Sequence, residues 1–402
     1  MDFAFSQQEE AFRQEVRDFI KKELPPDYRH EFMIVGLHEE DMPFTRSMAK
    51  KLAAKGWLTM SWPKEYGGQS RPPMEQVVYW EECSYYGVPG TDMGIGGILW
   101  IGPSLMLFGT EQQKRDHIPP IARGERFWCT GFSEPGSGSD LSGLQCRARL
   151  EGDHYVVNGQ KIWTSAAHVA DWMWLAVRTD PDAPKKSQGI SVLVVDMKTP
   201  GITVRRLKNP VGAEGLNEVF FDNVRVPKES VVGGENNGWL IVSAGLAMER
   251  GTPGVMNAAG IRRLLDDLVT FAKEATAGGK PLYQDPFVRS KLANFAIEAE
   301  IARLIAYWAV KVAFQPGAPQ AEVARTASIT KIVNAELYQR GLNTGMQILG
   351  LPGQLTTDSK WANLQGRIAR AYLFAPGFSI MSGTSEILRT VVATMGMGLP
   401  RK

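Results

Sequence analysis

The sequence is poor in the residues that cross-link small folds or hold metal ions. It has 402 residues but only three cysteines and five histidines. Cys83, Cys129 and Cys146 form no C-x-x-C motif, and no two histidines stand four residues apart or close to a cysteine. These absences argue against a disulfide framework, predict no metal site and favour a reduced compartment.

An excess of one charge is also missing. The formal net charge is +2 at pH 7, and the basic pairs Lys185-Lys186 and Arg205-Arg206 stand alone. A dedicated nucleic-acid surface usually carries a strongly basic stripe. We therefore expect no nucleic-acid partner.

Long hydrophobic runs are absent as well. The longest apolar patch, residues 96–109, is interrupted by Pro103, whereas a membrane-spanning helix needs about 20 apolar residues. The first residues resemble no targeting leader, because a helical pattern begins at once after the predicted capping box of Ser6 and Glu9. We expect a cytoplasmic protein without a membrane span.

Three blocks of hydrophobic pattern divide the chain. Residues 1–127 have helical periodicity, residues 128–232 contain short alternating runs separated by turn residues, and residues 233–402 return to long amphipathic helices. The fold class expected from this order is α+β. Its parts are an N-terminal helical domain, a middle β barrel or sandwich, and a C-terminal helical bundle.

Two segments of the middle block carry the most specific pattern. Residues 127–142 (FWCTGFSEPGSGSDLS) are rich in glycine and serine, so their hydroxyls and backbone N–H groups could hold the edge of a flavin ring and a pyrophosphate. In residues 155–163 (YVVNGQKIW), Asn158-Gly159 stands between two β-rich runs, which predicts a hairpin that returns Trp163 and Ser165 towards the first segment.

Together and in this order, the two segments resemble the flavin cradle of the acyl-CoA dehydrogenase family. Further similar stretches follow the family's order along the chain: residues 63–68 (PKEYGG), 108–114 (FGTEQQK), 124–125 (GE), 249–250 (ER), 347–350 (QILG) and 383–387 (GTSEI). The resemblance implies a C-terminal four-helix bundle and an FAD-dependent enzyme. Such an enzyme converts an acyl-CoA to the trans-2-enoyl-CoA and passes electrons to electron-transfer flavoprotein.

The resemblance also assigns cofactor contacts. It implies a flavin half of the site, with Phe132 and Ser133 at the ring edge, Gly138 and Ser139 at the pyrophosphate, Trp163 beside the ring and Ser165 near N5. It implies an adenosine half at a subunit contact, with Gln347, Gly350, Thr384 and Glu386. An oligomer, most simply a homotetramer or heterotetramer built through the bundle, follows from the second set.

The catalytic base departs from the family's commonest arrangement. Members usually carry a glutamate directly before the Gly-Thr pair near the C-terminus, and here that position is Ser382. The isovaleryl- and long-chain-type members instead carry it before an arginine on the first bundle helix, as in Glu249-Arg250. The resemblance therefore implies Glu249 as base and the backbone N–H of Ser382 as a thioester contact, with Ser139, Met248 and Arg250 also near the substrate. A surface charge is the alternative reading of Glu249.

Other features leave alternatives open. Many members have an Arg and a Phe that reach a neighbour's FAD, and residues 274–281 (EATAGGKP) offer neither, while Leu351 replaces a usual glycine. A non-catalytic or half-site subunit of a mixed oligomer is thus a second hypothesis, and a flavin monooxygenase or oxidase on the same fold is a third. Residues 251–254 (GTPG) indicate either a wide pocket for branched or cyclic acyl groups or a helix kink.

Overall fold

The chain folds into two compact units in the computed structural model. The structure describes residues 4–26, 28, 39–249, 253–357 and 359–400, and for residues 246–249 it describes the backbone alone. The first unit comprises residues 1–34, 72–88 and 250–402, and the second comprises residues 35–71 and 89–249. Each unit contains chain segments that are distant in sequence.

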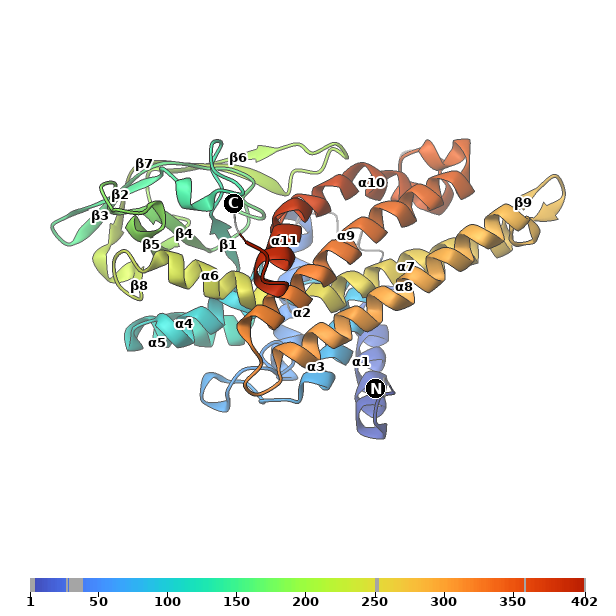
Figure 1. Cartoon of the computed structure of the whole chain (residues 1–402), viewed down its shortest axis with the longest axis horizontal. Helices are drawn as coiled ribbons and strands as arrows, with labels where there is room; N and C mark the ends of the chain where they lie inside the picture. Colours follow the sequence, from blue (N-terminus) through green and yellow to red (C-terminus); the bar gives the residue numbers. More distant parts are fainter. Residues whose placement is uncertain (1–3, 27, 29–38, 250–252, 358, 401–402) are drawn as a thin grey trace. The chain divides into compact units, whose positions relative to one another are not determined.

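The first unit is helical. Figure 1 shows its three longest helices running side by side, in agreement with their packing contacts. Its main helices are α1 (Gln7–Glu23), α3 (Pro73–Tyr86), α7 (Pro253–Glu274), α8 (Pro286–Ala313), α9 (Gln320–Leu349), α10 (Arg367–Phe374) and α11 (Ser385–Val391). A small hairpin of β9 (Thr276–Ala277) and β10 (Lys280–Pro281) joins α7 to α8.

Buried charges join α1 to the rest of this unit. The helix begins at the predicted capping box of Ser6 and Glu9, which is confirmed. From its inner face Arg13 donates to the carboxylates of Glu81 (2.5 Å) and Glu82 (2.6 Å) on α3. The hydroxyl of Tyr307 on α8 also donates to Glu81, at 2.7 Å. Because each charge has a partner, the burial of these groups is tolerated.

The second unit combines helices with one eight-stranded sheet. Its main helices are α2 (Met42–Ala54), α4 (Gly102–Phe108), α5 (Glu111–Ala122) and α6 (Gly238–Glu249), and a π-helical turn (Gly97–Ile101) precedes α4. The strands are β1 (Trp128–Gly131), β2 (Arg147–Glu151), β3 (His154–Lys161), β4 (Trp172–Arg178), β5 (Ile190–Asp196), β6 (Ile202–Leu207), β7 (Leu216–Pro227) and β8 (Val231–Val232). Their order is β6-β7-β3-β2-β4-β5-β8, and β1 pairs in parallel with β4 (Figure 1).

The alternating runs in the sequence become the strands of this sheet. Their inward residues, among them Val157, Leu175, Val219 and Val224, are fully buried in one core cluster. Strands with one buried face show this period of two because successive side chains point to opposite faces. The α+β fold class is confirmed.

One local prediction is wrong. Asn158-Gly159 is no hairpin turn but lies inside β3, at an irregularity in its pairing with β7. The hairpin that joins β2 to β3 turns at Gly152 and Asp153 instead. Gly159 has a φ of +140°, and a Cβ there would lie 2.8 Å from the Cα of Cys146. Glycine is therefore required by a bulge and a close backbone approach.

All three cysteines are free and buried. Burial raises the pKa of each thiol, to about 11 for Cys146 and further for Cys83 and Cys129. Among the helices of the described part of the chain, none combines the length and the apolar character needed to cross a bilayer.

Candidate functional site

The first candidate segment is a loop that leaves β1 and enters β2. It turns back on itself between Glu134 and Ser137, which exchange backbone hydrogen bonds of 2.9 and 3.0 Å. The hydroxyl of Ser137 donates to the carbonyl of Asp140 at 2.6 Å. Gly138 and Ser139 are exposed at the tip, and a Cβ at Gly138 would meet nothing within 4 Å. The backbone at this tip is therefore open to a ligand.

A buried ion pair holds the base of this loop. The ammonium Nζ of Lys161, at the end of β3, lies 2.7 Å from Oε1 of Glu134. The same ammonium donates to the carbonyl of Phe132 at 3.1 Å. Glu134 also accepts the backbone N–H groups of Gln145 (2.6 Å) and Cys146 (2.8 Å). Burial lowers the pKa of Lys161, and the Glu134 charge opposes this shift.

The second candidate segment follows Lys161 directly. The N–H of Ile162 donates to the carbonyl of Ser133 at 2.9 Å, so the two segments are joined. Trp163 then adopts a left-handed φ of +61° and leaves 59% of its surface exposed. Thr164 donates its N–H to the carbonyl of Asn217 at 3.0 Å. Because strained backbone conformations cluster at functional sites, this segment is a candidate for ligand contact.

The six predicted contacts of the flavin half thus lie on two segments that are joined by a backbone hydrogen bond. A flat ring can lie against the exposed indole of Trp163 and the half-buried Phe132, and a phosphate can approach the open backbone at Gly138. Ser133 and Ser165 are both half-buried. This donor and ring set fits a ligand that combines a flat heterocycle with a pyrophosphate.

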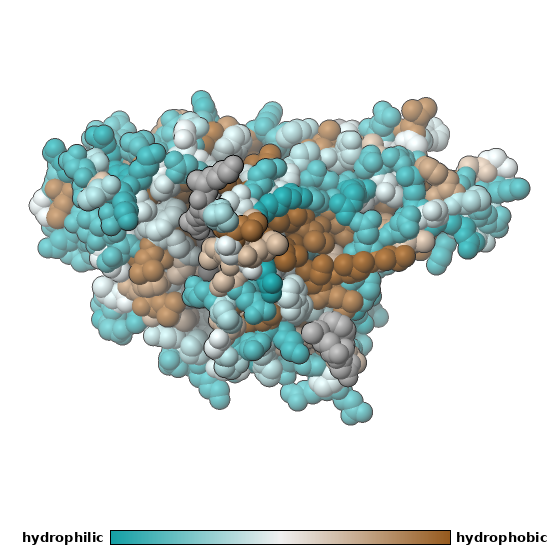
Figure 2. Space-filling model, viewed as in Figure 1, coloured by the Kyte–Doolittle hydropathy of each residue, from teal (hydrophilic) through white to brown (hydrophobic). Residues whose placement is uncertain are grey.

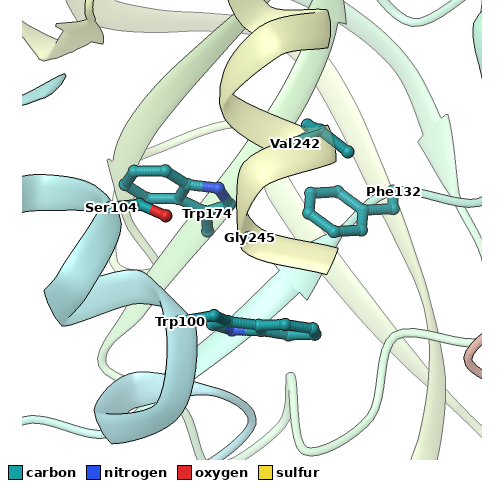
Figure 3. A pocket seen from close by; sticks show the side chains of 6 residues that line it. All are labelled: Trp100, Ser104, Phe132, Trp174, Val242 and Gly245. Atoms are coloured by element: carbon teal, nitrogen blue, oxygen red, sulfur yellow. The ribbon is translucent and has the colours of Figure 1, made fainter. Parts of the chain in front are cut away.

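A small aromatic pocket borders the first segment. Figure 3 shows the rings of Trp100, Trp174 and Phe132 around it. Its complete lining is Trp100, Ser104, Phe132, Trp174, Val242 and Gly245, and its volume of about 10 Å³ is close to the room that one water molecule needs. The centroids of the Trp100 and Phe132 rings lie 6.3 Å apart. Sequence patterns did not identify Trp100, Ser104 or Trp174, which read as ordinary core residues.

Helix α6 connects this pocket with the predicted base. Val242 and Gly245 line the pocket, and Glu249 is the last residue of the helix. Spacings of three and four residues place these positions on one helical face. The backbone of Glu249 therefore stands one turn beyond the pocket lining. The predicted contact Arg250 lies outside the described residues, and the side chain of Met248 is not described.

The remaining predicted residues lie in the first unit. Ser382 has a left-handed φ of +54° in the turn before α11. Thr384 caps that helix by accepting the N–H of Ile387 at 3.1 Å. Lys331 donates to the carbonyl of Gly383 at 2.7 Å, and this bond holds the turn that precedes α11.

The residues predicted for an adenosine half are largely exposed. Gln347 is exposed on the last turn of α9, and Gly350 ends that helix with a φ of +63°. Glu386 is exposed on the first turn of α11. Its own backbone N–H, followed by the Thr384 hydroxyl, lowers the pKa of its carboxyl.

Of the residues that bear on this site, sequence patterns missed Lys161. The contacts of its partner Glu134 are buried and reach the backbone of the loop, which indicates a structural role. Lys161 lies at an inward position of β3 and its side chain is fully buried. A lysine on the apolar face of a strand requires a buried partner, and that requirement was the available signal.

Comparison with known proteins accounts for the whole chain. The models of the acyl-CoA dehydrogenase N-terminal, middle and C-terminal domains match residues 6–125, 129–224 and 236–397. "Acyl-CoA dehydrogenase FadE26" of Mycobacterium tuberculosis is 34% identical over 405 residues, which cover 100% of this chain and 99% of that protein.

Two solved structures are similar over the full length of both chains. The "Tcur3481-Tcur3483 steroid ACAD" has a TM-score of 0.88 and 33% identity, with 100% of each chain covered. The ChsE4–ChsE5 complex from Mycobacterium tuberculosis has a TM-score of 0.87 and 32% identity, again with 100% of each chain covered. With all three domain models matched in order, the chain belongs to the acyl-CoA dehydrogenase family, whose members are FAD-dependent oxidoreductases.

Proposed function

We propose that the chain oxidises an acyl-CoA thioester to the trans-2-enoyl-CoA, with Glu249 as the base that removes the α-proton. The supporting observation is the face of α6, on which Val242 and Gly245 line a pocket that Phe132 borders and position 249 follows one turn later. A carboxylate next to apolar surfaces becomes a stronger base, because desolvation raises its pKa.

The flavin half of the cofactor site is proposed from the joined segments. Phe132 and Ser133 hold the ring edge, Trp163 covers the ring, Ser165 bonds near N5, and Gly138 with Ser139 holds the pyrophosphate. When bound, FAD supplies a hydride acceptor at N5. The exposed indole of Trp163 and the open backbone at Gly138 support this assignment. Gln347, Gly350, Thr384 and Glu386 stay the proposed contacts of the adenosine half.

The proposed role of Ser382 belongs to its backbone. Its N–H binds the thioester carbonyl and stabilises the enolate that proton removal creates. The left-handed φ of +54° supports a role for this turn, since non-glycine residues in that region concentrate at functional sites. Ser139, Met248 and Arg250 are the proposed substrate contacts.

Anaerobic bleaching of the flavin absorbance tests this function. The FAD-loaded protein is mixed with a panel of straight, branched, cyclic and steroid-like acyl-CoAs, and the product is analysed by mass spectrometry. We expect bleaching and a product lighter by two hydrogens, and reoxidation by electron-transfer flavoprotein rather than by O₂. No bleaching by any member contradicts the proposal, and rapid reoxidation by O₂ favours an oxidase or monooxygenase instead.

For the acyl group we propose a bulky, steroid-like class. The support is the 33% identity over the full length to a protein titled a steroid ACAD. The small residues after Glu249 lend no further support, because Gly254 is explained by packing. A Cβ at Gly254 would lie 2.4 Å from Cγ2 of Thr330 on α9. In the panel, a straight-chain substrate with the highest kcat/KM would contradict this choice.

We propose that the chain assembles into a tetramer through the bundle. Figure 2 shows hydrophobic residues gathered on the face where α8 lies in Figure 1. On α8, Ile297 is 60% exposed and Ile301, one turn later, is 49% exposed. Changing both to Glu should give a smaller species in light scattering, whereas Leu150→Glu, at an exposed strand position, should leave the mass unchanged.

A mixed oligomer is the second candidate. The hairpin β9–β10 contains only small residues, lysine and proline, so it lacks the Arg and Phe that many family members extend to a neighbour's FAD. The similarity to a two-protein complex, ChsE4–ChsE5, points in the same direction. Fewer than one FAD per chain in the purified protein, restored by co-expression with a second dehydrogenase chain, would favour this candidate over a homotetramer.

A further inference from the structure

The Lys161–Glu134 ion pair is buried, although the burial of two charges carries a large desolvation cost. The side chain of Lys161 is 0% exposed and that of Glu134 is 8% exposed. Removing two charges from water costs several kcal/mol per ion, and apolar residues of the same size are often as stabilising or more so. Net stability therefore does not explain why two charges occupy this part of the core.

The contacts of the pair explain it better. Glu134 accepts two backbone N–H groups at the exit of the loop, from Gln145 and Cys146. Lys161 donates to the carbonyl of Phe132 at the entrance. The pair thus links the two ends of the loop of residues 132–146. Its hydrogen bonds to the backbone reach Phe132 at the entrance, and Gln145 and Cys146 at the exit.

The pair also sets the distance between the two flavin segments. Lys161 immediately precedes Ile162, whose N–H donates to the carbonyl of Ser133. Trp163 follows with its strained backbone. The ammonium of Lys161 therefore contacts the first segment at Phe132, and its backbone continues into the second segment at Trp163. Buried polar contacts with fixed geometry hold such groups more accurately than apolar packing does.

We propose that Lys161 and Glu134 are positioning residues, which hold Phe132–Ser133 and Trp163–Ser165 at the separation that the flavin ring needs. This inference rests on the proposed assignment of those segments to the flavin. The pair itself does not touch the reacting atoms. Its removal changes the affinity for FAD and the environment of the bound ring, beyond any change in the stability of the protein without cofactor.

The test uses Lys161→Met, Glu134→Gln and the double variant. Each single change leaves a buried group without its charged partner, so we expect a lower melting temperature of the FAD-free protein. The double variant should recover only the part of that loss caused by an unpaired buried charge, because the glutamine amide has one oxygen for the two backbone N–H groups of Gln145 and Cys146. Its Kd for FAD should still be raised, by roughly tenfold, because displaced ring contacts lose part of their binding free energy. The visible absorption bands of the bound flavin should also shift.

A buried ion pair of the other unit provides the control. Arg13 donates to Glu81 at 2.5 Å and to Glu82 at 2.6 Å and joins α1 to α3. Arg13→Met should lower the melting temperature but leave the Kd for FAD and the flavin spectrum unchanged. If the double variant does not fold, Glu134→Asp keeps the charge and shortens the side chain, and it should still weaken FAD binding.

The outcomes distinguish the positioning role of the pair from the assignment of the two segments to the flavin. A wild-type Kd and a wild-type flavin spectrum in the double variant, or in Glu134→Asp where the double variant does not fold, overturn the positioning role. Trp163→Ala, measured in parallel, reports on the segments themselves. If Trp163→Ala weakens FAD binding while the pair variants do not, only the positioning role fails. If Trp163→Ala has no effect, the assignment of the flavin segments fails first.

Discussion

The N–H of Ile162 lies 2.9 Å from the carbonyl oxygen of Ser133, and this bond joins two segments that are separated by strands β2 and β3. It places Ser133 next to Ile162, the residue that precedes Trp163. The same unit contains the pocket lined by Phe132 and by α6. Ring contacts and the approach to the predicted base are therefore parts of one compact unit.

Replacement of Glu249 by Gln tests the base. The amide keeps the size of the side chain but accepts no proton, so FAD and acyl-CoA should still bind. We expect flavin reduction to slow at least about a hundredfold, the lower end for losing general base catalysis. Stopped-flow absorbance measures this rate. Ser382→Ala is the control, since the backbone N–H survives, and equal rates for Glu249→Gln and the wild type would make Glu249 a helix charge only.

Replacement of Trp163 by Ala tests the ring contact. Loss of an aromatic pair costs about 1 kcal/mol, roughly a fivefold rise in Kd. Isothermal titration of the FAD-free protein measures the change. Trp361 is also exposed, at 70%, and lies in the first unit, so Trp361→Ala should leave the Kd unchanged. An equal effect of the two variants would mean that Trp163 has no specific contact with the cofactor.

Acid should destabilise the protein through His117. Burial, together with the nearby charge of Arg126, lowers the pKa of this imidazole from 6.5 to about 4. Between these values the unfolded chain binds the proton and the folded chain does not, so stability falls as the pH drops from about 6.5 to about 4. Melting temperatures across this range should fall less in His117→Gln than in the wild type. Parallel curves for the two proteins would exclude the histidine as the cause.

Gly254→Ala should destabilise the first unit. A Cβ at this position meets Cγ2 of Thr330 at 2.4 Å, and overpacking of this kind costs about 1–3 kcal/mol. Thr330→Ser removes the obstructing methyl group and keeps the hydroxyl that donates to the carbonyl of Thr326. Thermal denaturation of the double variant should therefore recover most of the loss. A double variant as unstable as Gly254→Ala would point to another cause.

Much of the fold could be predicted from the sequence, because local residue patterns determine its helices and strands. Ile190–Asp196 is an almost continuously apolar run, as buried strands often are, and α1 begins at its capping box. The Asn158-Gly159 prediction failed for a non-local reason. The glycine is required by the backbone of Cys146, the residue just before β2, which no short pattern reveals.

The candidate site could be predicted for a different reason, namely the resemblance of its sequence segments to those of a known family. That resemblance located the loop and Trp163, but it gave no information on what holds them. The role of Lys161 can be inferred only once the fold places its ammonium beside Glu134. The domain boundaries after residues 127 and 232 stay predictions.

The burial of all three thiols makes the chain a ready background for site-directed labelling. Because Cys83, Cys129 and Cys146 are enclosed and burial raises the pKa of each thiol, maleimide reagents should react slowly with the folded wild-type protein. A single cysteine introduced at exposed Gly136, where a Cβ would meet nothing within 4 Å, would then carry a fluorophore in the loop without replacing a proposed cofactor contact. Such a probe would follow cofactor entry in real time, without any need to remove the native cysteines.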